Sequence, residues 1–299
     1  MNRLNYEKVF KTLVEETGNY LVNHSLRAMV LGVSGGIDST VVAAICCEVN
    51  KQTNIPLIGR SLPIKNKKDE FDVSTLVGEA FCNNFDVANL YDEYKCFLSG
   101  LVWREERIDL LDDTEAMHPE KSKQQTLIAN GNIQARLRMI YLYNLASIHN
   151  GLVMSTDNQT EYQLGFWTIH GDVGDFDPIQ DLWKTEVYQL AEWLKLFYYT
   201  DGDDADKAVA IGESIKLTPT DGLGISNSDL DQIGAKSYND VDRVLQTLVC
   251  PASPENDRVQ DALTVEIGPE IIDKIIKRRR NSRFKREKSP IYISRERYE

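Results

Sequence analysis

The chain alternates short apolar runs with longer segments in which apolar residues recur every three or four positions. The short runs are typical of buried strands and fall at residues 28–31, 56–63, 86–90 and 151–156. The longer segments predict helices at residues 5–21, 71–85, 132–149 and 184–197, with a further helix after residue 39. Strands that alternate with helices favour an α/β fold, in which helices flank a parallel sheet.

Two segments interrupt this pattern and predict loops. Residues 104–123 are highly charged and lack a sustained apolar period, and residues 200–227 contain Asp-Gly-Asp-Asp and several later glycines. Long loops of this kind often close over active sites. The composition is equally compatible with surface loops that have no such function.

The most informative motif joins the first short run to the helix that follows it. Residues 34–39 read Ser-Gly-Gly-Ile-Asp-Ser. Glycines let the backbone approach a ligand closely, and a helix N-terminus attracts an anion such as pyrophosphate. Asp38 fits such a site if Mg²⁺ lies between its carboxylate and the phosphate oxygens. A serine-capped joint between a strand and a helix is the simpler alternative for the glycine pair alone.

A second carboxylate is expected at the same edge of the sheet. Residues 155–161 read Ser-Thr-Asp-Asn-Gln-Thr-Glu and follow a predicted strand, so Glu161 can face the same cleft as Asp38. Two carboxylates from separate strand ends suit a site for Mg²⁺ and a triphosphate. Taken alone, Glu161 is better explained as an acidic residue that the helix dipole favours near a helix start.

Two later groups also carry candidate chemistry. Residues 168–178 hold Asp172, Asp175 and Asp177 among glycines, a loop that could hold a cation, an ammonium ion or a general base. An ordinary Asp/Gly turn is the alternative. Lys184 begins a predicted helix, where the dipole favours acids, so it is either a surface residue or a cation that neutralises a nearby triphosphate.

Composition narrows the class of protein. The 299 residues carry a formal net charge of −12, which argues against general nucleic-acid binding, and the 42% hydrophobic share supports a buried core. No apolar stretch approaches the ~20 residues that cross a bilayer, so no membrane contact is expected. The 5 cysteines show no Cys-x-x-Cys spacing, which favours reduced thiols in the cytoplasm. Residues 274–286 are strongly basic and form either a solvated helix face or a local clamp for phosphates.

The motifs, in this order, resemble those of the NAD synthetases, which are ATP pyrophosphatases. The matching segments are the loop at 34–39, Asn-Ile-Gln-Ala-Arg-Leu-Arg-Met at 132–139, Ser-Thr-Asp-Asn at 155–158 with Glu161, Gly-Asp at 171–172, Lys-Thr at 184–185, Pro-Thr-Asp at 219–221 and the basic end. The resemblance implies one NAD synthetase domain over residues 1–299. Within it, a Rossmann-like ATP pyrophosphatase core would span residues 25–200, and a helical, basic part residues 228–299.

The resemblance implies a cytoplasmic, homodimeric ligase that uses ATP, Mg²⁺ and ammonia to convert deamido-NAD to NAD. The nicotinate carboxylate would attack the α-phosphorus of ATP, forming an acyl-adenylate and pyrophosphate. Ammonia would then attack the activated carbonyl and release AMP.

The resemblance also assigns roles to individual residues. It implies that ATP is contacted by Gly32, Val33, Ser34, Gly35, Gly36, Ile37, Asp38, Ser39, Leu62, Thr156, Lys184 and Thr220. It implies that deamido-NAD is contacted by Asn132, Arg136, Asp175, Phe284 and Lys285, the last reaching in from the partner subunit in this family. Asp38 and Glu161 would bind Mg²⁺, and Asp172 and Lys184 would carry the catalysis, with Asp172 helping to receive ammonia.

The sequence departs from the family's usual residues at four positions. Ser61 stands where the family has arginine, with Arg60 one place earlier; Ile169 stands for a lysine, Val173 for a glycine and Phe284 for a histidine. The ATP–Mg²⁺ half of the expected site therefore matches the family better than the dinucleotide half.

Glutamine-dependent members of the family carry an added N-terminal amidase domain with a catalytic cysteine. Here about 25 residues precede the first predicted strand and contain no cysteine, so no amidase domain is expected. Free ammonia, or ammonia from a separate protein, is then the expected nitrogen donor.

Two other readings remain open at this point. The chain could be another ATP pyrophosphatase, similar to GMP synthetase or to a tRNA-modifying enzyme. The Asn-Ile-Gln-Ala-Arg helix argues against the first, and the adjacent Cys46 and Cys47, placed on a helix, fit a core better than a thiolation site. It could also be a non-catalytic nucleotide sensor, against which the retention of Asp38, Glu161 and Lys184 argues.

Overall fold

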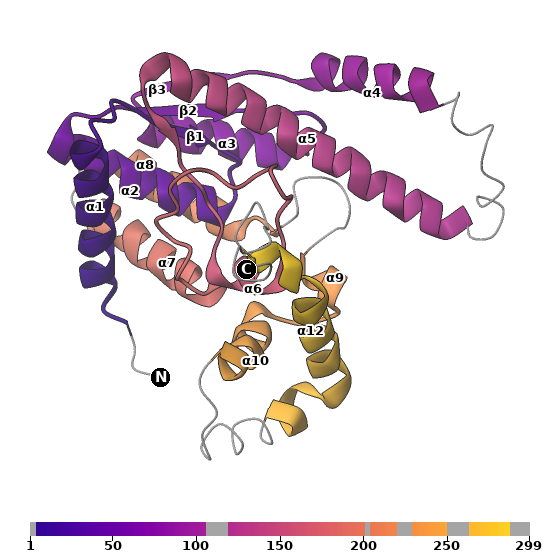
Figure 1. Ribbon diagram of the computed structural model, residues 1–299. Coiled ribbons are helices and arrows are strands. Elements are labelled where there is room, and N and C mark those ends of the chain that lie inside the picture. The colour runs from indigo at the N-terminus through magenta and orange to yellow at the C-terminus, as the bar shows by residue number, and fades with distance from the viewer. Residues whose placement is uncertain (1–3, 106–118, 201–203, 220–228, 250–262, 288–299) are drawn as a thin grey trace, which may run out of the picture.

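Figure 1 shows the computed structural model, which describes residues 4–105, 119–200, 204–219, 229–249 and 263–287. A four-stranded parallel sheet lies at its centre, in the order β3-β2-β1-β4. The strands are β1 (Met29–Gly32), β2 (Leu57–Ser61), β3 (Asn84–Val87) and β4 (Leu152–Val153). This architecture confirms the α/β fold with a parallel sheet that the sequence predicts.

Helices surround the sheet and continue below it (Figure 1). They are α1 (Tyr6–Asn23), α2 (Ile37–Thr53), α3 (Lys68–Phe81), α4 (Tyr91–Glu105), α5 (Pro119–His149), α6 (Gln159–Leu164), α7 (Lys184–Thr200), α8 (Ala205–Lys216), α9 (Asp229–Ile233), α10 (Tyr238–Val249) and α12 (Pro269–Asn281), with a short 3₁₀ helix, η3, at Arg283–Arg286. Within the described residues, no helix is long and apolar enough to span a membrane.

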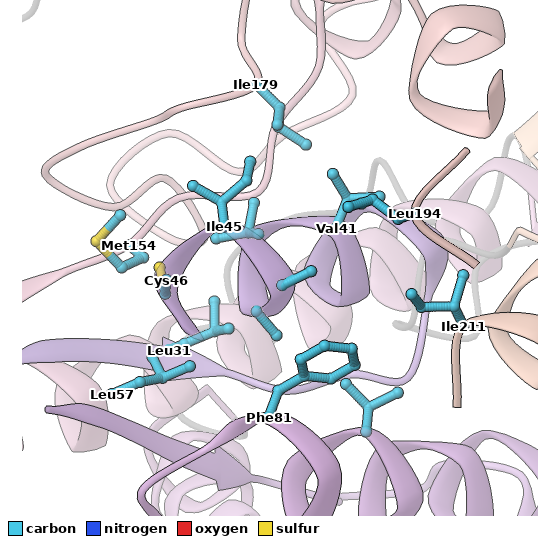
Figure 2. Packing of buried hydrophobic residues seen from close by; sticks show 14 of the residues in the cluster. Leu31, Val41, Ile45, Cys46, Leu57, Phe81, Met154, Ile179, Leu194 and Ile211 are labelled. Carbon is cyan, nitrogen blue, oxygen red and sulfur yellow. The ribbon is translucent and has the colours of Figure 1, made fainter. Parts of the chain in front are cut away.

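The two faces of the sheet belong to separate apolar clusters because side chains alternate along a strand. Met29 and Leu31 of β1 pack with α1, α2, α3, α7 and α8, whereas Val30 packs with α4 and α5. Figure 2 shows the first cluster, in which Ile45 of α2 and Leu194 of α7 are fully buried above the strands. The apolar runs of the sequence thus form a central layer that is covered on both faces, as parallel sheets require.

A third apolar cluster holds the C-terminal helices together. Its buried members include Leu164 of α6, Val241 and Leu245 of α10 and Ile275 of α12, and α10 and α12 lie next to α6 in Figure 1. The basic run at residues 274–286 falls on α12 and η3. The described part of the C-terminal region is therefore helical, as predicted.

Several predicted elements need correction. Helix α3 ends at Phe81 rather than residue 85, because the chain already joins the sheet as β3 at Asn84, two residues before the predicted strand. Strand β4 is only two residues long: the Met154 N–H still donates to the Val30 carbonyl of β1, but Met154 itself forms a separate bridge to Phe176.

Both predicted loops are helical in part. Helix α4 continues to Glu105 and α5 begins at Pro119, so only residues 106–118 of the first loop are left, and they lie outside the described residues. The second loop contains α8, whose buried residues Ala208 and Ile211 lie three positions apart. That helical spacing is present in the sequence, but the surrounding glycines and acidic residues obscure it.

Candidate active site

A cavity of about 900 Å³ opens at the carboxyl ends of β1, β2 and β4. Its walls include the loop that follows β1, Leu62 after β2, and Thr156 and Asp157 after β4. Open parallel sheets place ligands at this edge, because the loops that leave neighbouring strands converge there. The segments that the sequence singles out at strand ends therefore meet around one space.

The glycine-rich loop after β1 packs tightly against α3 and α8 on the side away from the cavity. Gly35 has a φ of 83°, and a Cβ at this position would lie 2.7 Å from the backbone nitrogen of Ser74 on α3. The Gly35 carbonyl accepts a hydrogen bond from the Ser214 hydroxyl of α8 at 2.7 Å. Only glycine fits this close approach, so the loop backbone is held by α3 and α8.

The other side of the loop faces the cavity. The loop residues that line it are Gly32, Val33, Ser34, Gly36, Ile37, Asp38 and Ser39. Gly36 is the N-cap of α2, and no side chain of the described residues caps this helix. Its first N–H groups therefore remain suited to an anion. Gly35, in contrast, shapes the loop from behind and is not a wall residue.

Three charged side chains meet at the end of this loop. The Lys184 ammonium donates to Asp38 Oδ2 at 2.5 Å and to Glu161 Oε1 at 2.9 Å. Its side chain is 2% exposed, compared with 15% for Asp38 and 17% for Glu161. Burial alone would lower the pKa of Lys184, but the two carboxylates raise it well above its usual value. The lysine is thus a charged, buried link between the two acids.

The local structure around Glu161 explains its position. Asn158 is the N-cap of α6 and forms a capping box with Glu161, in which each side chain accepts from the other residue's backbone N–H. The Asn158 amide also donates to Asp38 Oδ1 at 2.8 Å. The helix-start explanation of Glu161 is therefore correct, and the same residue also faces Asp38 across the cavity.

The arrangement fits a divalent cation that is shared with phosphate oxygens. The Lys184 ammonium shows that a cation is accommodated between Asp38 and Glu161. Among the described residues, no group of three or more His, Cys, Asp or Glu side chains could hold a metal ion alone. Mg²⁺ commonly takes only one or two carboxylates in nucleotide sites and completes its shell with phosphates and water. These residues therefore suit Mg²⁺ that is bound together with ATP.

Three partly buried acids lie near this cluster, and two of them, Asp157 and Asp172, line the cavity. Burial raises the pKa of Asp172 to about 6 and that of Asp177 to about 7, and it also raises the pKa of Asp157 well above its usual value. Asp172 accepts from the Thr168 N–H at 2.8 Å and lines the cavity. A carboxyl group with a pKa near 6 can exchange a proton near neutral pH, which suits a general base.

The expected contacts for deamido-NAD divide into two groups. Asn132 and Lys285 line the cavity. Arg136 instead donates to the Ile169 carbonyl at 2.9 Å, and Asp175 accepts from the Tyr143 hydroxyl at 3.1 Å. Both lie outside the cavity wall formed by the described residues, as does Phe284, which is 53% exposed.

The position of Lys285 differs from the expectation for a homodimer. Its ammonium donates to the carbonyls of Gly165 and Trp167 and lines the cavity of its own chain. Burial lowers the pKa of Lys285, and the neighbouring Arg278 lowers it further. The lysine therefore reaches the site without a partner subunit. Thr220, the last expected ATP contact, lies outside the described residues.

Sequence reasoning missed several wall residues. Arg138 lines the cavity and donates from Nε to the Leu62 carbonyl at 3.0 Å, and burial lowers its pKa to about 10. Phe166 and Trp167 form an aromatic wall, with the Arg278 guanidinium 4.3 Å from the Phe166 ring centre. Arg138 lies in the same sequence motif as Arg136. The motif therefore predicted the helix, but it did not show which face of the helix lines the cavity.

The fold and this site define an ATP-binding α/β enzyme, in which a phosphate loop follows the central strand of a parallel sheet. A family model described as NAD synthase matches residues 9–289. The chain therefore belongs to the NAD synthase family of carbon–nitrogen ligases.

Individual relatives agree with this assignment. The NH(3)-dependent NAD(+) synthetase of Methanococcoides burtonii is 31% identical over 92% of this chain and 90% of its own length. Among solved structures, NMN synthetase from Francisella tularensis has a TM-score of 0.71 at 23% identity, covering 98% of this chain and 100% of that one. The NH3-dependent NAD synthetase of Campylobacter jejuni has a TM-score of 0.66 at 22% identity, covering 97% and 100%. At these identities the two structures support the fold alone.

Proposed function

We propose that this chain uses ATP and ammonia to amidate the nicotinate carboxylate of deamido-NAD, through an acyl-adenylate, with release of AMP and pyrophosphate. The observation that carries the proposal is the cluster of Asp38, Glu161 and Lys184 at the mouth of the phosphate loop. Cleavage between the α- and β-phosphates demands ligands for a metal ion and a cation that balances the leaving pyrophosphate, which this cluster supplies, and an anion cradle, which the phosphate loop supplies.

The residues of the site would divide the work as follows. The N–H groups at the start of α2 would bind phosphate oxygens, and Lys184 would neutralise the charge that develops on pyrophosphate. Asp38 and Glu161 would hold Mg²⁺, which stabilises charge on phosphate oxygens when bound. Asp172, with its pKa of about 6, would take a proton from the incoming ammonium or amine. Trp167 would help to exclude water from the adenylate.

A second candidate substrate is nicotinate mononucleotide. The Francisella tularensis structure is that of an NMN synthetase. The observation that favours this candidate is the position of Arg136 and Asp175, both bonded within the chain and outside the cavity wall of the described residues. Both residues were expected to contact the dinucleotide, whereas a mononucleotide is smaller and would not need contacts from either of them.

We further propose that the protein is a homodimer. Ile140 and Ile148, two turns apart on α5, are 67% and 68% exposed, and Tyr143 between them is 38% exposed. Apolar side chains that share one helix face favour burial against a second copy. Light scattering on wild-type protein and on Ile140→Arg tests this, with a dimer expected for the first and a monomer for the second.

A coupled assay tests the reaction. Purified protein is given ATP, Mg²⁺, ammonium and either deamido-NAD or nicotinate mononucleotide, and the products NAD and NMN are separated by chromatography. NAD formed only when all four components are present would support the main proposal, and a faster reaction with the mononucleotide would support the second candidate. No amidation of either substrate by protein that binds ATP would contradict both.

A further inference from the structure

Helix α10 contributes a buried carboxylate, that of Asp242, which lies just outside the wall of the active-site cavity. Asp242 is 2% exposed and belongs to the apolar face of α10, between Val241 and Val244. Neither the phosphate loop nor the cavity wall includes this residue. A buried carboxylate is costly unless its oxygens are hydrogen-bonded, so its partners indicate what it does.

Both carboxylate oxygens of Asp242 bind residues next to the charged cluster. Oδ1 accepts from the Thr160 hydroxyl at 2.5 Å, and Oδ2 accepts from the Thr185 N–H at 2.9 Å. The Thr160 oxygen in turn accepts from the Lys184 N–H at 2.9 Å. One side chain therefore ties the first turn of α6 to the first turn of α7.

The bonded residues are the sequence neighbours of the two side chains that meet Asp38. Thr160 immediately precedes Glu161, and Thr185 immediately follows Lys184. Short backbone segments therefore transmit any shift of the carboxylate to both charged groups. Tyr238, four residues before Asp242 and so on the same face of α10, has its ring centre 5.5 Å from the Lys184 ammonium.

The electrostatics favour this arrangement. Helix α7 runs from Lys184 to Thr200, and its N-terminus carries a positive dipole end where a lysine is unfavourable. A carboxylate that accepts the Thr185 N–H compensates at this end of the helix. The chain thus stabilises the helix start that carries Lys184 by an acid 57 residues beyond Thr185 in the sequence.

We propose that Asp242 is a positioning residue for the nucleotide half of the site, which fixes Glu161 and Lys184 relative to Asp38 on the phosphate loop. The inference rests on the proposed use of ATP. It assigns the C-terminal helices a part in ATP binding, although they contribute none of the phosphate loop. On the nicotinate side of the cavity, Asn132 is bonded to Thr168 and Lys285 to Gly165 and Trp167, rather than to Asp242, Thr160 or Thr185.

The substitution Asp242→Asn tests this positioning role, because asparagine has nearly the same shape as aspartate. Asparagine has one carbonyl oxygen, so either Thr160 or the Thr185 N–H loses its acceptor. We expect the KM for ATP to rise about tenfold, and the Kd of a non-hydrolysable ATP analogue to rise in parallel, since this corresponds to about 1.4 kcal/mol. The KM for the nicotinate substrate should stay within about twofold.

Three further variants guard against a simple folding defect. Thr160→Val removes the same hydrogen bond from the other side and should reproduce the effect, whereas Thr160→Ser keeps the hydroxyl and should restore wild-type values. Arg243→Gln is the matched control, since Arg243 is the next residue on α10 but pairs with Glu266 at the surface. It should leave both KM values unchanged.

The outcomes separate this inference from the proposed function. Wild-type KM for ATP in both Asp242→Asn and Thr160→Val would overturn the positioning role, as would a parallel rise in the KM of both substrates. Wild-type protein that does not bind the ATP analogue would overturn the proposed function itself, and the positioning role with it.

Discussion

Replacing Lys184 by methionine should convert the buried ion cluster into a free metal site. Methionine keeps much of the length and apolar volume of lysine but removes the ammonium that bridges Asp38 and Glu161. In wild-type protein without nucleotide, this ammonium already occupies the position between the two carboxylates. The variant should therefore lose stability when metal-free, and regain it when a divalent cation is added.

The contacts set the size of the effect. The ammonium lies 2.5 and 2.9 Å from the two carboxylate oxygens, and its side chain is only 2% exposed. Removing one partner of a buried ion pair costs about 3–5 kcal/mol. The carboxylates are still partly exposed to the cavity, so the lower end applies, and Tm should fall by roughly 6–10 °C. Saturation with Mn²⁺ at one hundred times its Kd should restore about 2.7 kcal/mol.

Thermal unfolding with and without MnCl₂, together with Mn²⁺ binding followed by electron paramagnetic resonance, gives the readout. Lys184→Met should bind Mn²⁺ at least tenfold more tightly than wild-type protein in the absence of nucleotide. Lys207→Met is the control, because Lys207 pairs with Asp204 at 2.8 Å, away from the cavity wall. Equal Mn²⁺ stabilisation of wild-type protein and Lys184→Met would refute the shared cation position.

Three other predictions test separate parts of the structure. Gly35→Ala should destabilise the fold by about 1–3 kcal/mol and weaken binding of an ATP analogue, because its Cβ would meet a backbone nitrogen at 2.7 Å, whereas Gly100→Ala has no atom within 4 Å and should stabilise slightly. The pKa of Asp177, raised to about 7 by burial, means that its protonation stabilises the fold fully below about pH 4, and that this contribution is lost as the pH rises through 7. In urea unfolding, Asp177→Asn should therefore exceed wild-type stability at pH 8 and lose this advantage toward pH 4; an advantage that grows at low pH would contradict the assignment. Asp38→Ala and Glu161→Ala should each lower pyrophosphate release by a factor on the order of a hundred or more, and wild-type turnover in either would rule out the metal ligands.

The sequence predicts best those features that depend on local chemistry. The phosphate loop is recognisable because glycines, hydroxyls and a helix start are adjacent along the chain. Asp38 and Glu161 could be placed together because carboxyl ends of parallel strands share one edge of the sheet. Both inferences need only short segments and one topological rule.

The contacts that hold the site in place are not predictable in this way. Ser214 binds Gly35 across 179 residues, and Asp242 binds Thr160 across 82. Their positions depend on how α8 and α10 pack, and a single polar residue in a buried helix face has no periodic signal. The choice between Arg136 and Arg138 fails for a related reason: residues two apart on a helix point in nearly opposite directions, and composition does not say which side meets the cavity.

The hydrogen bond from Ser214 to the Gly35 carbonyl joins the phosphate loop to α8, which itself packs on α7. The Thr40 hydroxyl, 2.8 Å from that of Ser214, extends the link into the first turns of α2. Because these groups are buried, the loop opens only when α8 separates from α2. The Thr40 amide proton, which donates to the Gly36 carbonyl, should then exchange with solvent at a free energy close to that of global unfolding, rather than at that of a surface turn. The phosphate loop has the composition of a mobile loop but belongs to the part of the protein that opens most slowly. Its backbone therefore has its binding conformation before the anion arrives.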